Sequence, residues 1–141
     1  MKLLTSKVSI VTGAARGIGA AIALKLAEQG SHIAFTYVSD SSAEKANSLV
    51  SAIEKLGVKA KAYQVNAADF SACESLVNTI VSDFGTVDIC VNNAGISKDN
   101  LLLRLTPEQW DEVMNTNLKS VYNMTKQVIR PMMKAKSGSI I

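Results

Sequence analysis

The stretch that decides the fold lies near the start of the chain and reads Val11-Thr12-Gly13-Ala14-Ala15-Arg16-Gly17-Ile18-Gly19. A short apolar segment, residues 8–11, leads into it, and apolar residues at helical spacing follow it. A strand, a glycine-rich turn and a helix in this order present free backbone N–H groups at the helix N-terminus to a phosphate. The stretch therefore predicts a nucleotide-binding loop rather than an ordinary turn.

Each glycine of this loop has a separate physical task. Gly13 permits the tight turn, Gly17 lets a pyrophosphate approach the backbone, and Gly19 lets the helix pack closely on the strand. The spacing is Gly-x-x-x-Gly-x-Gly instead of the commoner Gly-x-Gly-x-x-Gly. The predicted cofactor contacts from this loop are Thr12, Gly13, Ala14, Ala15, Arg16, Gly17, Ile18 and Gly19.

The composition fits one domain and excludes several classes of function. The chain has 141 residues, of which 48% are apolar, and this is enough to bury a core. Fifteen basic and twelve acidic residues give a net charge of only +3, which is too weak for a nucleic-acid surface. No apolar run approaches the roughly 18 residues of a membrane span, and the first residues do not form a signal peptide. We expect a cytoplasmic protein without nucleic-acid or membrane partners.

The two cysteines, Cys73 and Cys90, are isolated and lack the spacing of metal ligands. Isolated cysteines of this kind behave as small core hydrophobes in a reducing compartment. We therefore expect both side chains in the core and no metal site.

Short β-rich segments alternate with helical segments along the chain. The predicted strands are Val8–Thr12, His32–Tyr37, Lys59–Val65 and Val87–Asn92. This order predicts an α/β fold of the Rossmann type, with a doubly wound parallel sheet covered by helices on both faces. A fifth strand begins after Gly138 and stops with the sequence, so we expect residues 1–141 to be the N-terminal part of a single NADP-binding domain, truncated after the start of this strand.

Capping residues predict where the helices begin and end. Three stretches match the capping box, namely Ser41–Glu44, Ser71–Glu74 and Thr106–Gln109, the last with Pro107 at the first helical position. The helices are expected to stop near Gly30, Gly57, Gly85 and Gly138. The last helical region is predicted from Pro107 to Ala135, with an apolar stripe of Trp110, Val113, Met114, Leu118, Val121, Met124, Val128 and Met132.

The residues after the second predicted strand indicate which nucleotide binds. A site for NAD usually has Asp or Glu there, about 20 residues past the loop, to hold the ribose 2′-OH. Tyr37 occupies this position, whereas Arg16 in the loop offers a guanidinium to a 2′-phosphate. The pattern favours NADP(H) over NAD(H). Asp40 keeps the alternative open, because a small shift in register makes it the ribose acid.

A second motif, Asn92-Asn93-Ala94-Gly95, follows the fourth predicted strand. An ordinary turn also uses Asn and Gly. The motif, however, lies at the carboxyl end of a strand expected beside the first, where ligands bind in such sheets. We therefore assign Asn93, Ala94 and Gly95 to the cofactor site, the last two because small residues let a cofactor lie against the backbone.

The two motifs together resemble the short-chain dehydrogenase/reductase family, and the resemblance covers the whole chain. Residues 93–104, with Trp110 and residues 115–118, are most similar to the 3-oxoacyl-(acyl-carrier-protein) reductases of this family. Those enzymes reduce a 3-oxoacyl thioester with NADPH in fatty-acid biosynthesis. The resemblance also implies a homotetramer built partly on the last helix, cofactor contacts from Asn66 and Ala67, and a place for Val38 near the 2′-phosphate.

The resemblance makes Asn117 the asparagine of an Asn-Ser-Tyr-Lys catalytic tetrad, which kinks its helix and holds a water for proton relay. The alternative is an amide satisfied by local backbone, because burying it unpaired costs about 1–3 kcal/mol. The resemblance places the Ser, Tyr and Lys beyond Ile141. Tyr122 and Lys126 have the spacing of the Tyr–Lys pair, but they precede the fifth strand, so we interpret them as surface residues.

Arg130, Lys134 and Lys136 form a basic helix end, which the helix dipole alone explains. The resemblance adds docking of an acidic acyl carrier protein through Lys136 and Arg130. The sequence as a whole predicts an NADPH-dependent 3-oxoacyl-(acyl-carrier-protein) reductase. Two alternatives remain: a short-chain reductase of another carbonyl substrate, and a catalytically inactive nucleotide-binding fragment if the chain ends at Ile141.

Overall fold

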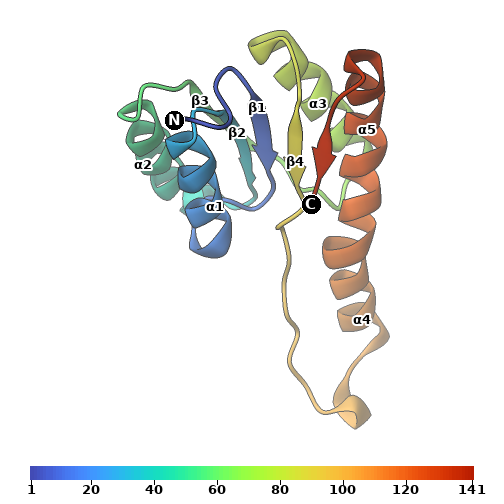
Figure 1. The fold of residues 1–141 in the computed structure, drawn as a ribbon. Coiled ribbons are helices and arrows are strands. Elements are labelled where there is room, and N and C mark those ends of the chain that lie inside the picture. Colours follow the sequence, from blue (N-terminus) through green and yellow to red (C-terminus); the bar gives the residue numbers. More distant parts are fainter.

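The computed structural model describes residues 1–141 and contains one five-stranded parallel sheet (Figure 1). The strand order is β3-β2-β1-β4-β5, and every neighbouring pair is parallel. This arrangement confirms the predicted doubly wound α/β fold, and β5 confirms that a fifth strand begins where expected. The strands are β1 (Val8–Val11), β2 (His32–Tyr37), β3 (Ala60–Gln64), β4 (Ile89–Val91) and β5 (Ser139–Ile140).

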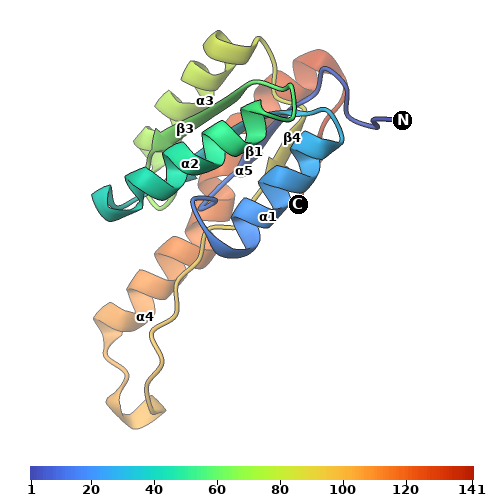
Figure 2. The same cartoon turned by 90° about the vertical axis from the view of Figure 1, so that its left-hand side faces the viewer.

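Helices cover both faces of the sheet, as Figures 1 and 2 show. Residues of α1 and α2 share one hydrophobic core with the sheet, and residues of α3 and α5 share a second core on the opposite face. None of these helices is long and apolar enough to cross a membrane. The helices are α1 (Gly17–Glu28), α2 (Ala43–Glu54), α3 (Phe70–Phe84), α4 (Pro107–Met114) and α5 (Ser120–Ala135).

The core residues of β1 and β4 alternate between the two faces, as the period of a strand requires. Ile10 faces α3 and α5, whereas Val11 faces α1 and α2. Both cysteines are fully buried in the core beneath α3 and α5, which confirms their prediction as core residues. Burial raises the pKa of Cys90 to about 12 and that of Cys73 to about 11, so both thiols stay protonated at neutral pH.

One of the three predicted capping boxes is present. The Thr106 hydroxyl accepts the Gln109 N–H at 3.2 Å, and the Gln109 side chain accepts the Thr106 N–H at 3.1 Å. The prediction for Ser71 is wrong, because Asp69 caps α3 two residues earlier. Its carboxylate accepts the N–H of Ala72 at 3.0 Å.

The prediction that Ser41 caps α2 is also wrong. Residues 40–42 form a short 3₁₀ turn before the helix, and no side chain caps α2. The hydroxyls there bond one another instead, since Ser39 Oγ lies 2.9 Å from Ser41 Oγ and 3.0 Å from Ser42 Oγ. The three serine hydroxyls therefore bond one another, and none of them bonds an N–H group of the first turn of α2.

The predicted glycine stops are confirmed for the first three helices. Gly30, Gly57 and Gly85 all have positive φ and lie at or just beyond the ends of α1, α2 and α3. The last helix also ends near its predicted glycine, at Ala135, but the left-handed conformation there belongs to Lys136, with φ of 53°, rather than to Gly138. At Gly138 the chain passes close to Met132, and a Cβ on this residue would lie 2.5 Å from the Met132 side chain.

The predicted helical region over residues 107–135 is confirmed, and within it residues 115–119 form a π-helical segment between α4 and α5. The apolar stripe is buried only in α5, through Met124, Val128 and Met132. Trp110 and Leu118 remain 56% and 60% exposed. The reason is visible in Figure 1: residues 96–114, here called the arm, project beyond the carboxyl edge of the sheet, where there is no core to cover them.

Asp83, near the end of α3, joins this helix to the edge strand β3. Its Oδ2 accepts a hydrogen bond from Tyr63 Oη at 2.6 Å and forms an ion pair with Lys61 Nζ at 2.8 Å. The hydrogen bond from Lys61, followed by that from Tyr63, lowers the pKa of Asp83 below its ordinary value of 3.8. Burial, with the Asp83 carboxylate beside it, raises the pKa of the Tyr63 hydroxyl.

Acidification should remove the stabilisation that this carboxylate provides. A carboxyl group with a lowered pKa in the folded state stabilises the fold above its unfolded pKa, and the effect disappears as the pH falls through the folded pKa. We expect the difference in urea midpoint between wild type and Asp83→Asn to be largest at pH 7 and to shrink as the pH falls below about 4 and through the lowered pKa of Asp83. A difference that is equal at all pH values would contradict this assignment.

Candidate functional site

The two sequence motifs meet at the carboxyl edge of the sheet, because β1 and β4 are parallel neighbours. Thr12 Oγ1 accepts the N–H groups of Asn93 and Ala94, each at 3.0 Å. The Asn93 side chain returns two bonds, from Nδ2 to the carbonyls of Thr12 at 3.0 Å and Gly13 at 3.1 Å. The glycine loop and the loop after β4 are therefore one hydrogen-bonded unit.

Thr36 on β2 holds the other side of the glycine loop. Its hydroxyl accepts the Gly13 N–H at 3.0 Å, and its carbonyl accepts the Ala14 N–H at 2.9 Å. Sequence reasoning missed Thr36, although it directly precedes Tyr37. The available signal was a hydroxyl residue near the carboxyl end of the second predicted strand, His32–Tyr37.

The glycines of the loop fit the tasks inferred from their spacing. Gly13 and Gly17 have φ of 64° and 63°, which side chains rarely adopt. A Cβ on Gly19 would lie 2.5 Å from Asn93 Nδ2 and 2.7 Å from the Gly13 carbonyl oxygen. A Cβ on Gly17 would meet nothing within 4 Å, so the backbone there is open to a ligand.

A cavity of 420 Å³ lies above this loop and collects most of the predicted cofactor residues. Thr12 and Ala14 of the same loop do not line the cavity. Both are buried, and they form hydrogen bonds to the loop after β4 and to β2, respectively. Sequence reasoning missed Ser39, Ser42, Ile96 and Thr116. The lining comprises residues 13, 15–19, 37–39, 42, 93–96 and 116.

The cavity fits the phosphates of a dinucleotide. The first turn of α1 has no capping side chain and no acidic residue, so its N–H groups remain available to an anion. Arg16, at the N-cap, adds a cation to the same lining. Tyr37 and Val38 also line the cavity, while Asp40 does not.

Asn66 and Ala67, which the family resemblance places at the cofactor, lie outside the cavity lining. Asn66 Oδ1 accepts the N–H of Ala68 at 3.0 Å in a local turn. Ala67 is buried, and its carbonyl accepts Asn123 Nδ2 at 2.9 Å and the Cys73 thiol at 3.4 Å. Asn123 is fully buried, and its Oδ1 has no hydrogen-bond partner. The bond from Asn123 of α5 to Ala67 was not predicted from the sequence.

Asn117 lies in the π-helical segment and binds the loop after β4. Its Oδ1 accepts the Ile96 N–H, and its Nδ2 donates to the Ile96 carbonyl, both at 2.8 Å. The residue is exposed, and both polar atoms of its amide are nevertheless hydrogen-bonded. The amide is satisfied by backbone 21 residues away rather than by local backbone. The break in the helix falls where the resemblance implies a kink, and π turns are frequent at functional sites.

Tyr122 and Lys126 are surface residues, as interpreted from the sequence. The Tyr122 ring is 53% exposed and stacks on Phe70 with centroids 6.1 Å apart. Lys126 Nζ lies 3.3 Å from the Tyr122 hydroxyl and 5.4 Å from the Phe70 ring centroid.

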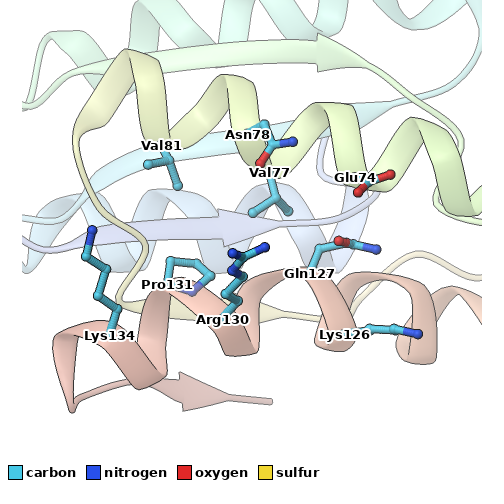
Figure 3. Close-up of a pocket in the computed structure, with 9 residues that line it drawn as sticks. All are labelled: Glu74, Val77, Asn78, Val81, Lys126, Gln127, Arg130, Pro131 and Lys134. Carbon is cyan, nitrogen blue, oxygen red and sulfur yellow. The ribbon is translucent and has the colours of Figure 1, made fainter.

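A second hollow, the α3–α5 groove, has a cavity volume of 460 Å³. Figure 3 shows Arg130 and Lys134 of α5 directed across it toward α3. Lys136 lines a different hollow, with Met133 and Gly138. The two residues assigned to carrier-protein docking therefore do not share one surface hollow. The groove is lined by Glu74, Val77, Asn78, Val81, Lys126, Gln127, Arg130, Pro131 and Lys134.

The fold and the joined loops define a dinucleotide-binding protein of the doubly wound α/β class. The short chain dehydrogenase family model matches residues 7–141, and the chain belongs to this family.

The relatives extend this assignment. The 3-oxoacyl-[acyl-carrier-protein] reductase FabG of Staphylococcus epidermidis is 46% identical over 136 residues, which are 96% of this chain and 55% of that protein. The chain thus spans about half the length of the curated relatives it matches.

Two solved structures show the same architecture. A short chain dehydrogenase from Burkholderia cenocepacia in complex with NADP has a TM-score of 0.87 and 41% identity, covering 91% of this chain and 51% of that one. An NAD⁺-bound xylitol dehydrogenase has a TM-score of 0.92 and 30% identity, covering 99% of this chain and 53% of that one. Similar folds therefore hold either nucleotide, so the fold does not decide the cofactor.

A methyl group at Gly19 should disrupt the unit formed by the two loops. Gly19→Ala places Cβ against Asn93 and the Gly13 carbonyl, so we expect a loss of about 1–3 kcal/mol of stability and weaker nucleotide binding. Urea unfolding and calorimetric titration with NADP⁺ measure the two effects. Gly57→Ala is the control for lost stability alone, because its φ of 84° disfavours any side chain, while its Cβ meets nothing within 4 Å and the residue lies between α2 and β3, outside the glycine loop. Unchanged NADP⁺ affinity in Gly19→Ala would contradict the role of this close contact.

Proposed function

We propose that the protein uses NADPH to reduce 3-oxoacyl-(acyl-carrier-protein) to 3-hydroxyacyl-(acyl-carrier-protein) in fatty-acid biosynthesis. The observation that carries the proposal is the continuous edge from the glycine loop, through Asn93, to the Ile96–Asn117 contact. A dinucleotide with its phosphates at Gly17 would extend along this edge toward Asn117. The similarity to the staphylococcal reductase supports the substrate.

The polar groups near the end of β2 support NADPH over NADH. Arg16, Ser39 and Ser42 line the cavity there, and no carboxylate does. A guanidinium and two hydroxyls suit the 2′-phosphate of NADPH, whereas a ribose 2′-OH is usually held by an acid. Val38, 56% exposed at the same lining, fits its predicted place near the 2′-phosphate.

When bound, NADPH supplies the hydride that reduces the 3-keto carbon. The chain's own residues fix the surroundings. Asn117 holds Ile96 through both polar atoms of its amide, and each atom keeps capacity for one more hydrogen bond on its exposed side. We propose that the water of the proton relay binds there. Gly95 keeps this approach open, since a Cβ would lie 3.4 Å from Asn117 Oδ1.

Oxidation of NADPH with an acetoacetyl thioester of acyl carrier protein tests this function. We expect turnover with NADPH to exceed turnover with NADH. Asn117→Ala should lower kcat on the order of 100-fold, the scale of lost proton transfer. Asn115→Ala is the matched control, because Asn115 lies exposed in the same π-helical segment and its side chain makes no hydrogen bond.

Turnover of a sugar, steroid or small alcohol in place of the acyl thioester would favour the other short-chain reductases. Binding of NADPH without any turnover would favour a nucleotide-binding chain that lacks catalysis. Equal loss of kcat in Asn117→Ala and Asn115→Ala would contradict the catalytic assignment of Asn117.

We also propose acyl carrier protein as the partner, with Arg130 more important than Lys136. Arg130 faces the α3–α5 groove beside Lys134, and neither cation has an ion-pair partner (Figure 3). Glu74 is the one acidic residue of the lining. Unpaired cations in a groove attract an acidic surface more strongly than paired ones do.

Charge reversals should separate the two residues. At low salt we expect Arg130→Glu to weaken carrier-protein binding about tenfold and Lys136→Glu to weaken it less. Lys45→Glu is the control, because it makes the same charge change on α2, on the opposite face of the sheet. Surface plasmon resonance measures all three. An affinity insensitive to Arg130→Glu would exclude docking in the groove.

The exposed apolar residues of the last helical region support the expected homotetramer. Leu118, Tyr122, Ile129 and Met133 are each between 45% and 71% exposed. Their spacing of four, seven and four residues places them along one helical face. We propose that this face forms subunit contacts.

A further inference from the structure

Asp40 is the acidic residue that follows β2, and a glutamine on the neighbouring strand binds it. Gln64 Nε2 donates to Asp40 Oδ1 at 2.6 Å and to the Val38 carbonyl at 3.0 Å. Gln64 is the last residue of β3 and pairs with Tyr37 in the parallel register of β2 and β3. Its position is therefore set by the sheet, while its amide reaches the turn beyond β2.

The bond decides which side chains of this turn reach the cofactor cavity. Ser39 and Ser42, on either side of Asp40, line the cavity with Arg16, but Asp40 does not. The 3₁₀ turn of residues 40–42 and the Gln64 amide together direct the carboxylate toward β3. The one carboxylate that follows β2 closely is thus removed from the place where a ribose acid would stand.

We propose that Gln64 is a specificity-determining residue, which holds the Asp40 carboxylate away from the 2′-phosphate position and so sets the preference for NADP(H) over NAD(H). The inference rests on the proposed function, in which Arg16, Ser39 and Ser42 receive the 2′-phosphate. A released Asp40 acts in two ways on this site. Its charge repels a phosphate, and its oxygens accept a ribose 2′-OH.

Two roles of the Gln64–Asp40 bond make different predictions. A bond that only braces the turn would, when lost, weaken NADP⁺ and NAD⁺ binding together, because both nucleotides use the same loop. A bond that restrains the carboxylate would weaken NADP⁺ binding and strengthen NAD⁺ binding. The ratio of the two affinities therefore separates specificity from structure.

The experiment measures Kd for NADP⁺ and NAD⁺ by calorimetry on wild type, Gln64→Leu, Gln64→Glu and Asp40→Asn. We expect Gln64→Leu to weaken NADP⁺ binding about tenfold and to strengthen NAD⁺ binding. Gln64→Glu, which keeps the side-chain size and repels Asp40, should show at least the same change. Asp40→Asn alone should leave the NADP⁺ affinity unchanged, because the wild-type carboxylate is already held away.

The double variant Gln64→Leu with Asp40→Asn isolates the carboxylate. It should recover the wild-type NADP⁺ affinity, because no released charge remains. Gln64→Lys should also keep the preference, since an ammonium holds the carboxylate as the amide does. Recovery in the double variant is a result that a purely structural brace does not produce, because the double variant still lacks the bond.

The outcomes distinguish this inference from the function on which it rests. A wild-type protein that binds NAD⁺ more tightly than NADP⁺ would overturn the proposed cofactor itself. A wild type that prefers NADP⁺, with the same affinity ratio in Gln64→Leu and Gln64→Glu, would overturn the role of Gln64 alone. Loss of both affinities in equal measure would also overturn it.

Discussion

The hydroxyl of Thr12 makes the contacts on which the rest of the site depends. It is 2% exposed, accepts the N–H groups of Asn93 and Ala94, and lies within reach of the Val91 carbonyl. All the hydrogen-bonding capacity of a hydroxyl is thereby used between two parallel neighbouring strands. Without it, the part-buried Ala94 N–H would lack a partner, at a cost of about 1–3 kcal/mol, and the Asn93 N–H would keep only its bond to the Val91 carbonyl at 3.1 Å. This side chain and the Asn93 amide together fix the separation of the glycine loop from the loop after β4.

The consequences of this tie run in both directions along the sheet edge. Toward β2, Thr36 holds Gly13 and Ala14, so the glycine loop is supported on both sides. In the other direction, the loop after β4 continues to Ile96, whose backbone Asn117 binds. The series of hydrogen bonds that begins at the end of β1 thus ends at the contact between Ile96 and Asn117, which lie 21 residues apart in the sequence. The arm beyond it has no core of its own and is positioned through this contact and the ion pair between Lys98 and Glu112 at 3.2 Å.

Local chemistry explains what could be predicted from the sequence. Glycines at 13, 17 and 19 encode positive φ and close approach in their residue type, so the loop was predictable without knowing its neighbours. Contacts distant in sequence were not predictable in this way. Helical periodicity cannot show that residues 115–119 form a π turn where Asn117 meets Ile96. The bond between Gln64 and Asp40 likewise depends on the β2–β3 register, which a pattern of apolar residues leaves open.

The distribution of charge shows the same difference between sequence and structure. Along the sequence the fifteen basic residues are scattered, and only Arg16 and the basic end of the last helix indicate a site. In the structure, several lysines are neutralised by ion pairs, such as Lys7 with Asp88 and Lys61 with Asp83. Arg16 and Arg130 have no such partner and face hollows. Because an unpaired cation in a hollow keeps its attraction for an external anion, Arg16 makes the cofactor cavity attractive to anions, and Arg130 does the same for the α3–α5 groove together with Lys126 and Lys134.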